Sequence, residues 1–217
     1  MKDPSSWSVC LVTDRGLSKG RTTQDIVERA VEGGVSVVQL REKGLDTRRF
    51  LEEGIKIKDF LRARDIPLII NDRIDVALAL DADGVHLGRS DMPVDVARRL
   101  LGPAKIIGLS VNKASHITEE SAELADYLAI SPLFHTATKE DITKPWGLTG
   151  LAHARSMTDK PLCAIGGIHA GNAGVITNTG ADFVAVVSAI VSSDDPEEST
   201  RLLVSEASAG KKARTAA

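Results

Sequence analysis

The chain has 217 residues, of which 42% are hydrophobic and 26% charged, so it can bury a core as one large α/β domain or two small ones. Its net charge of −3 and its isoelectric point of about 6.0 argue against a protein that binds a phosphate backbone. Four Phe, two Trp and one Tyr leave few rings on which single strands could stack. We therefore expect no nucleic-acid partner.

No apolar run approaches the roughly 18–20 residues of a membrane span, and the first residues, MKDPSSWS, lack the apolar stretch of a signal peptide. We therefore expect a cytoplasmic protein without a membrane partner. Cys10 and Cys163 lie in apolar runs without C-x-x-C spacing, which favours two buried thiols over a disulfide or a redox pair. The sequence leaves open whether the chain forms a homo-oligomer.

Strand-like and helix-like segments alternate along the chain. The predicted strands are 9–14, 36–42, 67–70, 84–87, 105–111, 127–134, 161–165 and 183–187. The predicted helices are 22–32, 47–64, 73–80, 94–101, 116–125, 148–157, 171–178 and 196–207. Eight such units without a composition break favour a single (β/α)8 TIM barrel over an open doubly wound sheet. We expect one domain over 1–208 and a flexible basic tail at 209–217.

Two carboxylates follow neighbouring predicted strands. Asp72 comes just after the third strand, and Asp91 follows the fourth after a short turn. Because parallel neighbours end at the same rim, we expect both side chains there, as a seat for a hard divalent cation. Each could instead be a helix N-cap. Asp75 and Asp83 are weaker candidates, since the first lies in a helix start and the second precedes a strand at the opposite rim.

The second predicted strand ends in alternating polar residues. The period of two points Gln39, Arg41 and Lys43 to one face and Glu42 to the other. A guanidinium fork beside an ammonium suits a polyanion such as a diphosphate. Alternatively, Arg41 pairs with Glu42 or another neighbour as a rim salt bridge.

Later strand ends carry further ligand-binding candidates. The fifth strand brings Ser110, and the loop 136–139 (TATK) carries two hydroxyls and an ammonium that could close over a charged ligand or simply be solvated. The pair Gly166-Gly167, with Ser188 after the eighth strand, suits a phosphate held by backbone N–H groups, although two glycines also make a tight turn. Two anion sites beside a cation suggest two substrates, one carrying a diphosphate leaving group.

These strand-end motifs together resemble the thiamine-phosphate synthase family. The matching segments are QLREK at 39–43, the run from NDRID to RSDMP at 71–93, IIGLSV at 106–111, TATK at 136–139, GL-x-GL at 147–151, AIGGI at 164–168 and VAVVSAI at 184–190. The resemblance implies a (β/α)8 transferase of thiamine biosynthesis that uses Mg²⁺. It implies coupling of 4-amino-2-methyl-5-hydroxymethylpyrimidine diphosphate to hydroxyethylthiazole phosphate, by a dissociative substitution in which diphosphate leaves first.

The resemblance also assigns site residues. Those implied to bind the pyrimidine diphosphate are Gln39, Arg41, Lys43, Asn71, Ser110 and Lys139, and of these Arg41, Lys43, Ser110 and Lys139 are expected to act in catalysis. Those implied to bind the thiazole phosphate are Thr136, Thr138, Gly167, Val187 and Ser188. Asp72 and Asp91 would ligate Mg²⁺.

The chain departs from the family pattern in the loop after the sixth strand and at Asn112, where the family commonly has a hydroxyl or a small residue, and rival functions stay open. His135 stands where the family usually has a proline, which makes that loop less rigid. His86 lies within GVHLG, and a hydrogen-bonded core role is favoured there over a catalytic one. The rival functions are a related thiazole tautomerase, which would not need the diphosphate and metal residues, and a non-catalytic sensor of a thiamine precursor.

Overall fold

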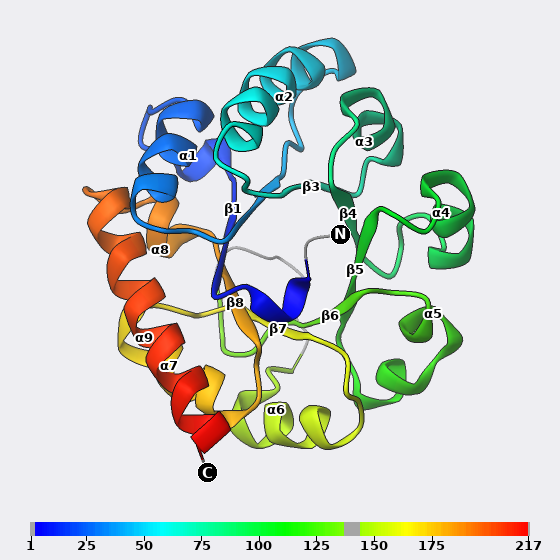
Figure 1. Ribbon diagram of the computed structural model, residues 1–217, viewed down its shortest axis with the longest axis vertical. Helices are drawn as coiled ribbons and strands as arrows, with labels where there is room; N and C mark the ends of the chain where they lie inside the picture. The colour runs from blue at the N-terminus through cyan, green and yellow to red at the C-terminus, as the bar shows by residue number, and fades with distance from the viewer. Residues whose placement is uncertain (1–2, 137–143, 217) are drawn as a thin grey trace.

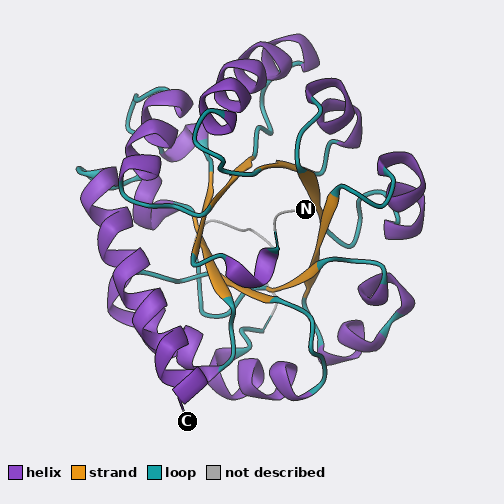
Figure 2. Ribbon diagram, viewed as in Figure 1, coloured by secondary structure: helices purple, strands orange, loops and turns teal. Residues whose placement is uncertain are grey.

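The computed structural model describes residues 3–136 and 144–216, and it is a closed barrel of eight parallel strands in sequence order. Figure 1 and Figure 2 show the helices as a ring around this barrel. The predicted (β/α)8 barrel is therefore confirmed. The strands are β1 Val9–Val12, β2 Val37–Leu40, β3 Leu68–Asn71, β4 Gly84–Leu87, β5 Ile106–Val111, β6 Tyr127–Ile130, β7 Leu162–Ile165 and β8 Phe183–Val186.

The helices follow the strands, as the alternating pattern predicts. The α-helices are α1 Thr23–Glu32, α2 Thr47–Arg62, α3 Ile74–Leu80, α4 Val94–Leu101, α5 Glu120–Glu123, α6 Gly147–Ser156, α7 Ala170–Thr179, α8 Ser188–Val191 and α9 Pro196–Ala216. The 3-10 helices are η1 Pro4–Ser6, η2 Arg15–Leu17 and η3 Ala114–Thr118. Across residues 3–136 and 144–216, none of these helices has the length and apolarity to cross a membrane.

Several predicted boundaries are wrong. The sixth strand ends at Ile130 instead of continuing to residue 134, because Pro132 has no N–H with which to extend the ladder. The predicted helix 116–125 is divided into η3 and the short α5. The helix α8, directly after β8, was not predicted, because four residues are too few to show a helical period.

Aromatic side chains fill the amino-terminal half of the barrel interior. The rings of Trp7, Tyr127 and Phe183 meet edge to face, with centroids 5.2 to 5.8 Å apart. Trp7 follows η1, and Figure 2 shows that short helix within the outline of the barrel. Because η1 precedes β1, it covers the end where the strands begin, which leaves the carboxyl end for ligands.

Cys10 and Cys163 lie in the same interior cluster as free thiols, which confirms the prediction of buried, unpaired cysteines. Burial raises the pKa of Cys10 to about 12 and the pKa of Cys163 well above its ordinary value. Since the thiolate is the reactive form, neither thiol is activated as a nucleophile.

The same type of hydrogen bond links neighbouring strands at several places along the amino-terminal rim. A carboxylate just before β4, β6 and β8 accepts the N–H of a residue near the start of the preceding strand, at 2.7 to 2.8 Å. The pairs are Asp83 with Leu68, Asp126 with Ile107 and Asp182 with Leu162. Ser36, before β2, accepts the N–H of Ser8 at 3.1 Å in the same way. Asp83 is therefore a structural carboxylate, as its expected position at the opposite rim implied.

The last helix is longer than the sequence predicts. α9 runs to Ala216, so the prediction of a flexible tail is wrong for residues 209–216. Lys211 donates to the carbonyl oxygens of Ser5 and Trp7, and Arg214 donates to Asp182 at 2.7 Å. The basic residues that suggested a frayed end in the sequence therefore attach the helix to the amino-terminal rim.

The contact between α7 and α9 provides a test of this docking. A Cβ on Gly210 would lie 1.9 Å from the carbonyl oxygen of Gly174, so Gly210→Ala must force the two helices apart. We expect it to lower the free energy of unfolding by about 1–3 kcal/mol in urea denaturation. Lys212→Ala, at an exposed position of the same turn, should change it by less than about 0.5 kcal/mol. Equal stability of both variants would contradict a docked α9.

Candidate active site

Asp72 lies at the carboxyl end of β3 in an unusual backbone conformation. Its φ is +62°, a region that non-glycine residues seldom adopt. The N–H of Arg73 donates to the carbonyl oxygen of Asn71 at 2.7 Å, which makes a γ-turn centred on Asp72, and the Asp72 N–H donates to the carbonyl oxygen of His86 at 2.9 Å. Backbone strain of this kind concentrates at functional sites.

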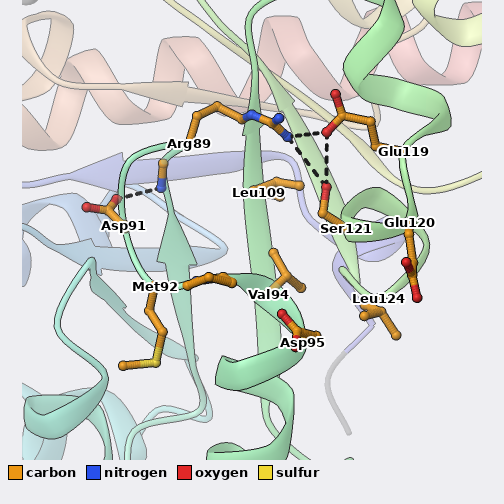
Figure 3. A pocket seen from close by; sticks show the side chains of 12 residues that line it. Arg89, Asp91, Met92, Val94, Asp95, Leu109, Glu119, Glu120, Ser121 and Leu124 are labelled. Atoms are coloured by element: carbon orange, nitrogen blue, oxygen red, sulfur yellow. Dashed lines mark hydrogen bonds and ion pairs between the residues drawn. The ribbon is translucent and has the colours of Figure 1, made fainter.

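Asp91 meets Asp72 from the loop between β4 and α4. The two carboxyl groups border one pocket and lie close enough for Asp91 to raise the pKa of Asp72, which confirms the prediction that they lie together. One Asp91 oxygen also accepts the Gly88 N–H at 2.7 Å, and Figure 3 shows the carboxylate turned toward that backbone. The N-cap alternative is wrong for both residues, because α3 is preceded by Arg73 and α4 by Pro93 in the cap positions.

The carboxylate pair is electrostatically unfavourable when both members are ionised. Burial, the hydrogen bond with Asp91 and repulsion by that carboxylate raise the pKa of Asp72 to about 6. The nearby charges of Lys43 and Arg41 act in the opposite direction, which places the two cations of the β2 end close to the pair. A divalent cation would remove the repulsion that the pair carries above that pH.

The donor set fits a cation that retains other ligands. Across the part of the chain that the structure describes, no group of three or more His, Cys, Asp or Glu side chains is placed to hold a metal ion. Two carboxylates without histidine or cysteine suit Mg²⁺, which keeps several waters and takes further oxygens from substrate phosphates. Asp72 and Asp91 would hold such an ion. Asp75 does not join them, because its carboxylate accepts hydrogen bonds from Arg73.

The cations that follow β2 are positioned by the end of β1. Arg41 donates to Asp14 at 2.8 Å, and the Thr13 hydroxyl accepts the Arg41 N–H at 2.9 Å. Glu42 instead accepts from Arg15 and from Thr23 of α1, so the salt bridge of Arg41 is with Asp14 and not with Glu42. The sequence reasoning missed Thr13 and Asp14, although both follow a strand at this same rim.

Directly below the mouth, several polar side chains lie on neighbouring strands of the barrel. Gln39 is buried on β2, and Asn71 of β3 pairs in register with His86 of β4. His86 is hydrogen-bonded to Ser110 of β5 and to Tyr127 of β6, which agrees with the favoured core role of the histidine. Gln39, Asn71 and Ser110 therefore lie on strands next to the carboxylate pair, and their binding roles stay predictions.

The predicted thiazole phosphate residues come from two neighbouring loops. Gly167, at φ +67°, lies so close to the preceding loop that a Cβ would be 2.8 Å from the carbonyl oxygen of His135. This contact brings the chain just before Thr136 beside Gly167. Val187 precedes α8, whose first residue, Ser188, is exposed. The glycine is thus required by its turn and by the close approach, and the structure leaves phosphate binding a prediction. Thr138 and Lys139 lie outside the described residues.

Two pockets are bordered by one or both members of the carboxylate pair. One, of about 410 Å³, lies between the β4–α4 loop and α5, where Arg89 pairs with Glu119 at 2.6 Å (Figure 3). The other, of about 470 Å³, is bordered by both Asp72 and Asp91 together with the exposed side chains of Leu78 and Leu100.

The family model described as thiamine monophosphate synthase matches residues 9–190. The chain belongs to this family. The thiamine-phosphate synthase of Albidiferax ferrireducens is 54% identical over 86% of this chain and 85% of its own length. That of Chloroflexus aurantiacus is 47% identical over 91% of both chains.

Solved structures agree with the family assignment. A thiamine phosphate pyrophosphorylase from Pyrococcus furiosus is similar with a TM-score of 0.87 and 35% identity, over 95% of this chain and 98% of that one. A 3-hexulose-6-phosphate synthase, at 18% identity and a TM-score of 0.65, covers 92% of this chain and 99% of its own length. The second similarity shows the barrel fold alone, whereas the first accompanies the family.

The raised pKa of Asp72 predicts how pH affects stability without metal. A carboxyl whose pKa is about 6 in the folded state and 3.8 otherwise stabilises the fold when protonated, and that contribution is lost as pH rises through about 6. In EDTA, the Tm of the wild type should therefore fall relative to that of Asp72→Asn between about pH 4 and pH 7. Asn tolerates the positive φ, which makes this variant a suitable reference. A difference in Tm between the two proteins that does not change with pH would contradict the raised pKa of Asp72.

Proposed function

We propose that the mouth of the barrel joins a pyrimidine diphosphate to a thiazole phosphate, releasing diphosphate and forming thiamine phosphate, as a thiamine-phosphate synthase. Family membership and near-full-length relatives of that name support this transferase activity. The single structural observation that carries it is the contact between Asp72 and Asp91 beside Arg41 and Lys43. Cationic side chains and a metal-binding carboxylate pair at one rim would stabilise the negative charge of a diphosphate leaving group.

The reaction divides between two sides of the mouth. On the side of β2 to β5, Gln39, Arg41, Lys43, Asn71 and Ser110 would bind and orient the pyrimidine diphosphate. Arg41 is already oriented by Asp14, so less conformational freedom is lost when it engages an anion. A Mg²⁺ ion held by Asp72 and Asp91 would supply charge neutralisation at the leaving diphosphate.

The second substrate would lie across the mouth. Gly167, Val187 and Ser188 would bind the thiazole phosphate together with Thr136 and with Thr138, which lies outside the described residues. Lys139, also outside the described residues, would contact the pyrimidine diphosphate. We propose that the diphosphate leaves first, so that the chain orients two substrates and needs no nucleophile of its own. The high pKa values of both buried cysteines agree with that proposal. We also propose that the reaction takes place in the cytoplasm.

The carboxylate pair provides the main test. With both substrates and Mg²⁺, we expect Asp72→Ala and Asp91→Ala to lower the rate of thiamine phosphate formation by more than about 100-fold, because each removes a metal ligand. Asp75→Ala is the matched control, since that carboxylate lies on the same rim but is bonded to Arg73. Wild-type rates in either test variant would refute the metal assignment. Isomerisation of the thiazole without coupling would instead identify a tautomerase.

Ser188 tests the other side of the mouth. Ser188→Ala should raise KM for the thiazole phosphate about fivefold, as expected for the loss of one hydrogen bond, and leave KM for the pyrimidine diphosphate unchanged. Steady-state kinetics with each substrate varied in turn would measure both. Ser192→Ala, at the end of the same helix, is the control. An unchanged KM for the thiazole phosphate would remove Ser188 from the site.

A further inference from the structure

Three side chains form a hydrogen-bonded series from the apolar barrel interior to the mouth. His86 lies between the other two, with Nδ1 3.0 Å from the Tyr127 hydroxyl and Nε2 2.9 Å from Ser110 Oγ. Its ring also stacks on that of Tyr127, with centroids 5.6 Å apart and an interplanar angle of 27°. Both nitrogens of the imidazole are therefore engaged, and its orientation is fixed from two strands.

The surroundings of Tyr127 determine which atom donates. The hydroxyl lies in the cluster that contains Trp7, Phe183 and the two cysteines, where burial raises the pKa of Tyr127 well above its ordinary value. It therefore keeps its proton. Within residues 3–136 and 144–216, His86 Nδ1 is the hydrogen-bond acceptor available to it. Because an unpaired buried hydroxyl is unfavourable, Tyr127 donates to Nδ1.

We propose that His86 is a positioning residue that sets the direction of the Ser110 hydroxyl. With Nδ1 accepting from Tyr127, the neutral imidazole carries its proton on Nε2 and donates it to Ser110 Oγ. The hydroxyl proton of Ser110 is then free to point to the mouth and donate to a ligand there. The identity of that ligand, the pyrimidine diphosphate, rests on the proposed function, whereas the order of donors does not.

A glycine on β5 makes this arrangement sterically accessible. Gly108 lies in register with both His86 and Tyr127 on the neighbouring strands. A Cβ there would be 2.1 Å from Tyr127 Cζ and 2.3 Å from its hydroxyl oxygen. Any side chain at position 108 would displace the hydroxyl from His86. The absence of a Cβ at 108 thus admits the donor that fixes the imidazole.

Nitrogen-15 NMR of histidine-labelled protein at neutral pH tests the order of donors directly. The His86 resonances, assigned as those missing from His86→Gln, should show the Nε2–H tautomer in the wild type. Tyr127→Phe keeps the ring and removes the donor, so the population of the Nδ1–H tautomer should increase. An Nδ1–H tautomer in the wild type, or no change in Tyr127→Phe, would overturn the proposal whether or not the protein makes thiamine phosphate.

Kinetics test the consequence for the substrate. His86→Leu and Tyr127→Phe should raise KM for the pyrimidine diphosphate about fivefold or more, with little change in KM for the thiazole phosphate. His86→Gln should restore most of the affinity, because its amide nitrogen can donate to Ser110 as Nε2 does. Cys163→Ala, in the same interior cluster, is the control for a general disturbance of the barrel.

The kinetic outcomes separate positioning from packing. Equal losses in His86→Leu and His86→Gln, or a similar loss in Cys163→Ala, would show that His86 acts only by filling space. If the wild type formed no thiamine phosphate, the proposed function would fail, and the tautomer measurement would still decide the role of His86.

Discussion

The closure of eight parallel strands into one cylinder is the constraint on which the site depends. Parallel strands that close must all end at the same mouth, so residues far apart in the chain meet there without any direct sequence relation. The side chains at the opposite, amino-terminal end of the barrel stabilise the fold. Its aromatic cluster around Trp7 and its rim carboxylates, such as Asp182, occupy the space and the backbone donors that a ligand would otherwise use. The fold thereby separates stabilising contacts from binding contacts along the axis of the barrel.

Within the mouth, Asp72 combines several features that are energetically unfavourable for the folded protein. Its backbone lies in the left-handed region, its carboxylate is partly buried, and it lies against a second carboxylate. None of these features stabilises the protein without a ligand, and together they favour binding of a cation. The neighbouring Arg41 and Lys43 only partly offset the repulsion, and Arg41 is itself shared with Asp14. This arrangement is typical of a binding site that is organised before its ligand arrives.

The sequence was informative where a single rule of geometry decides the outcome. Parallel neighbours end together, so the meeting of Asp72 with Asp91 followed from their positions after adjacent strands. The family resemblance then supplied the identity of both substrates, which no spacing of residues could give. The contact of His86 with Ser110 could not be predicted from the sequence, because it depends on which interior side chains of neighbouring strands meet.

Other features were missed because they depend on contacts distant in the chain. The polar, basic end of the sequence resembles a solvated tail, and only its packing through Gly210 and its hydrogen bonds from Lys211 make it helical to Ala216. The carboxylates before β4, β6 and β8 form a repeat that is evident only once their acceptor role is known. Asp14 escaped notice because its partner, Arg41, lies on the next strand.

The most direct measurement of the central claim is a crystal structure with Mn²⁺ in place of Mg²⁺ and with inorganic diphosphate. An anomalous difference peak within about 2.0–2.3 Å of oxygens from both Asp72 and Asp91, with diphosphate oxygens completing the coordination, is the predicted result. A metal ion bound elsewhere on the barrel, or a diphosphate bound without either carboxylate in its coordination shell, would contradict the account.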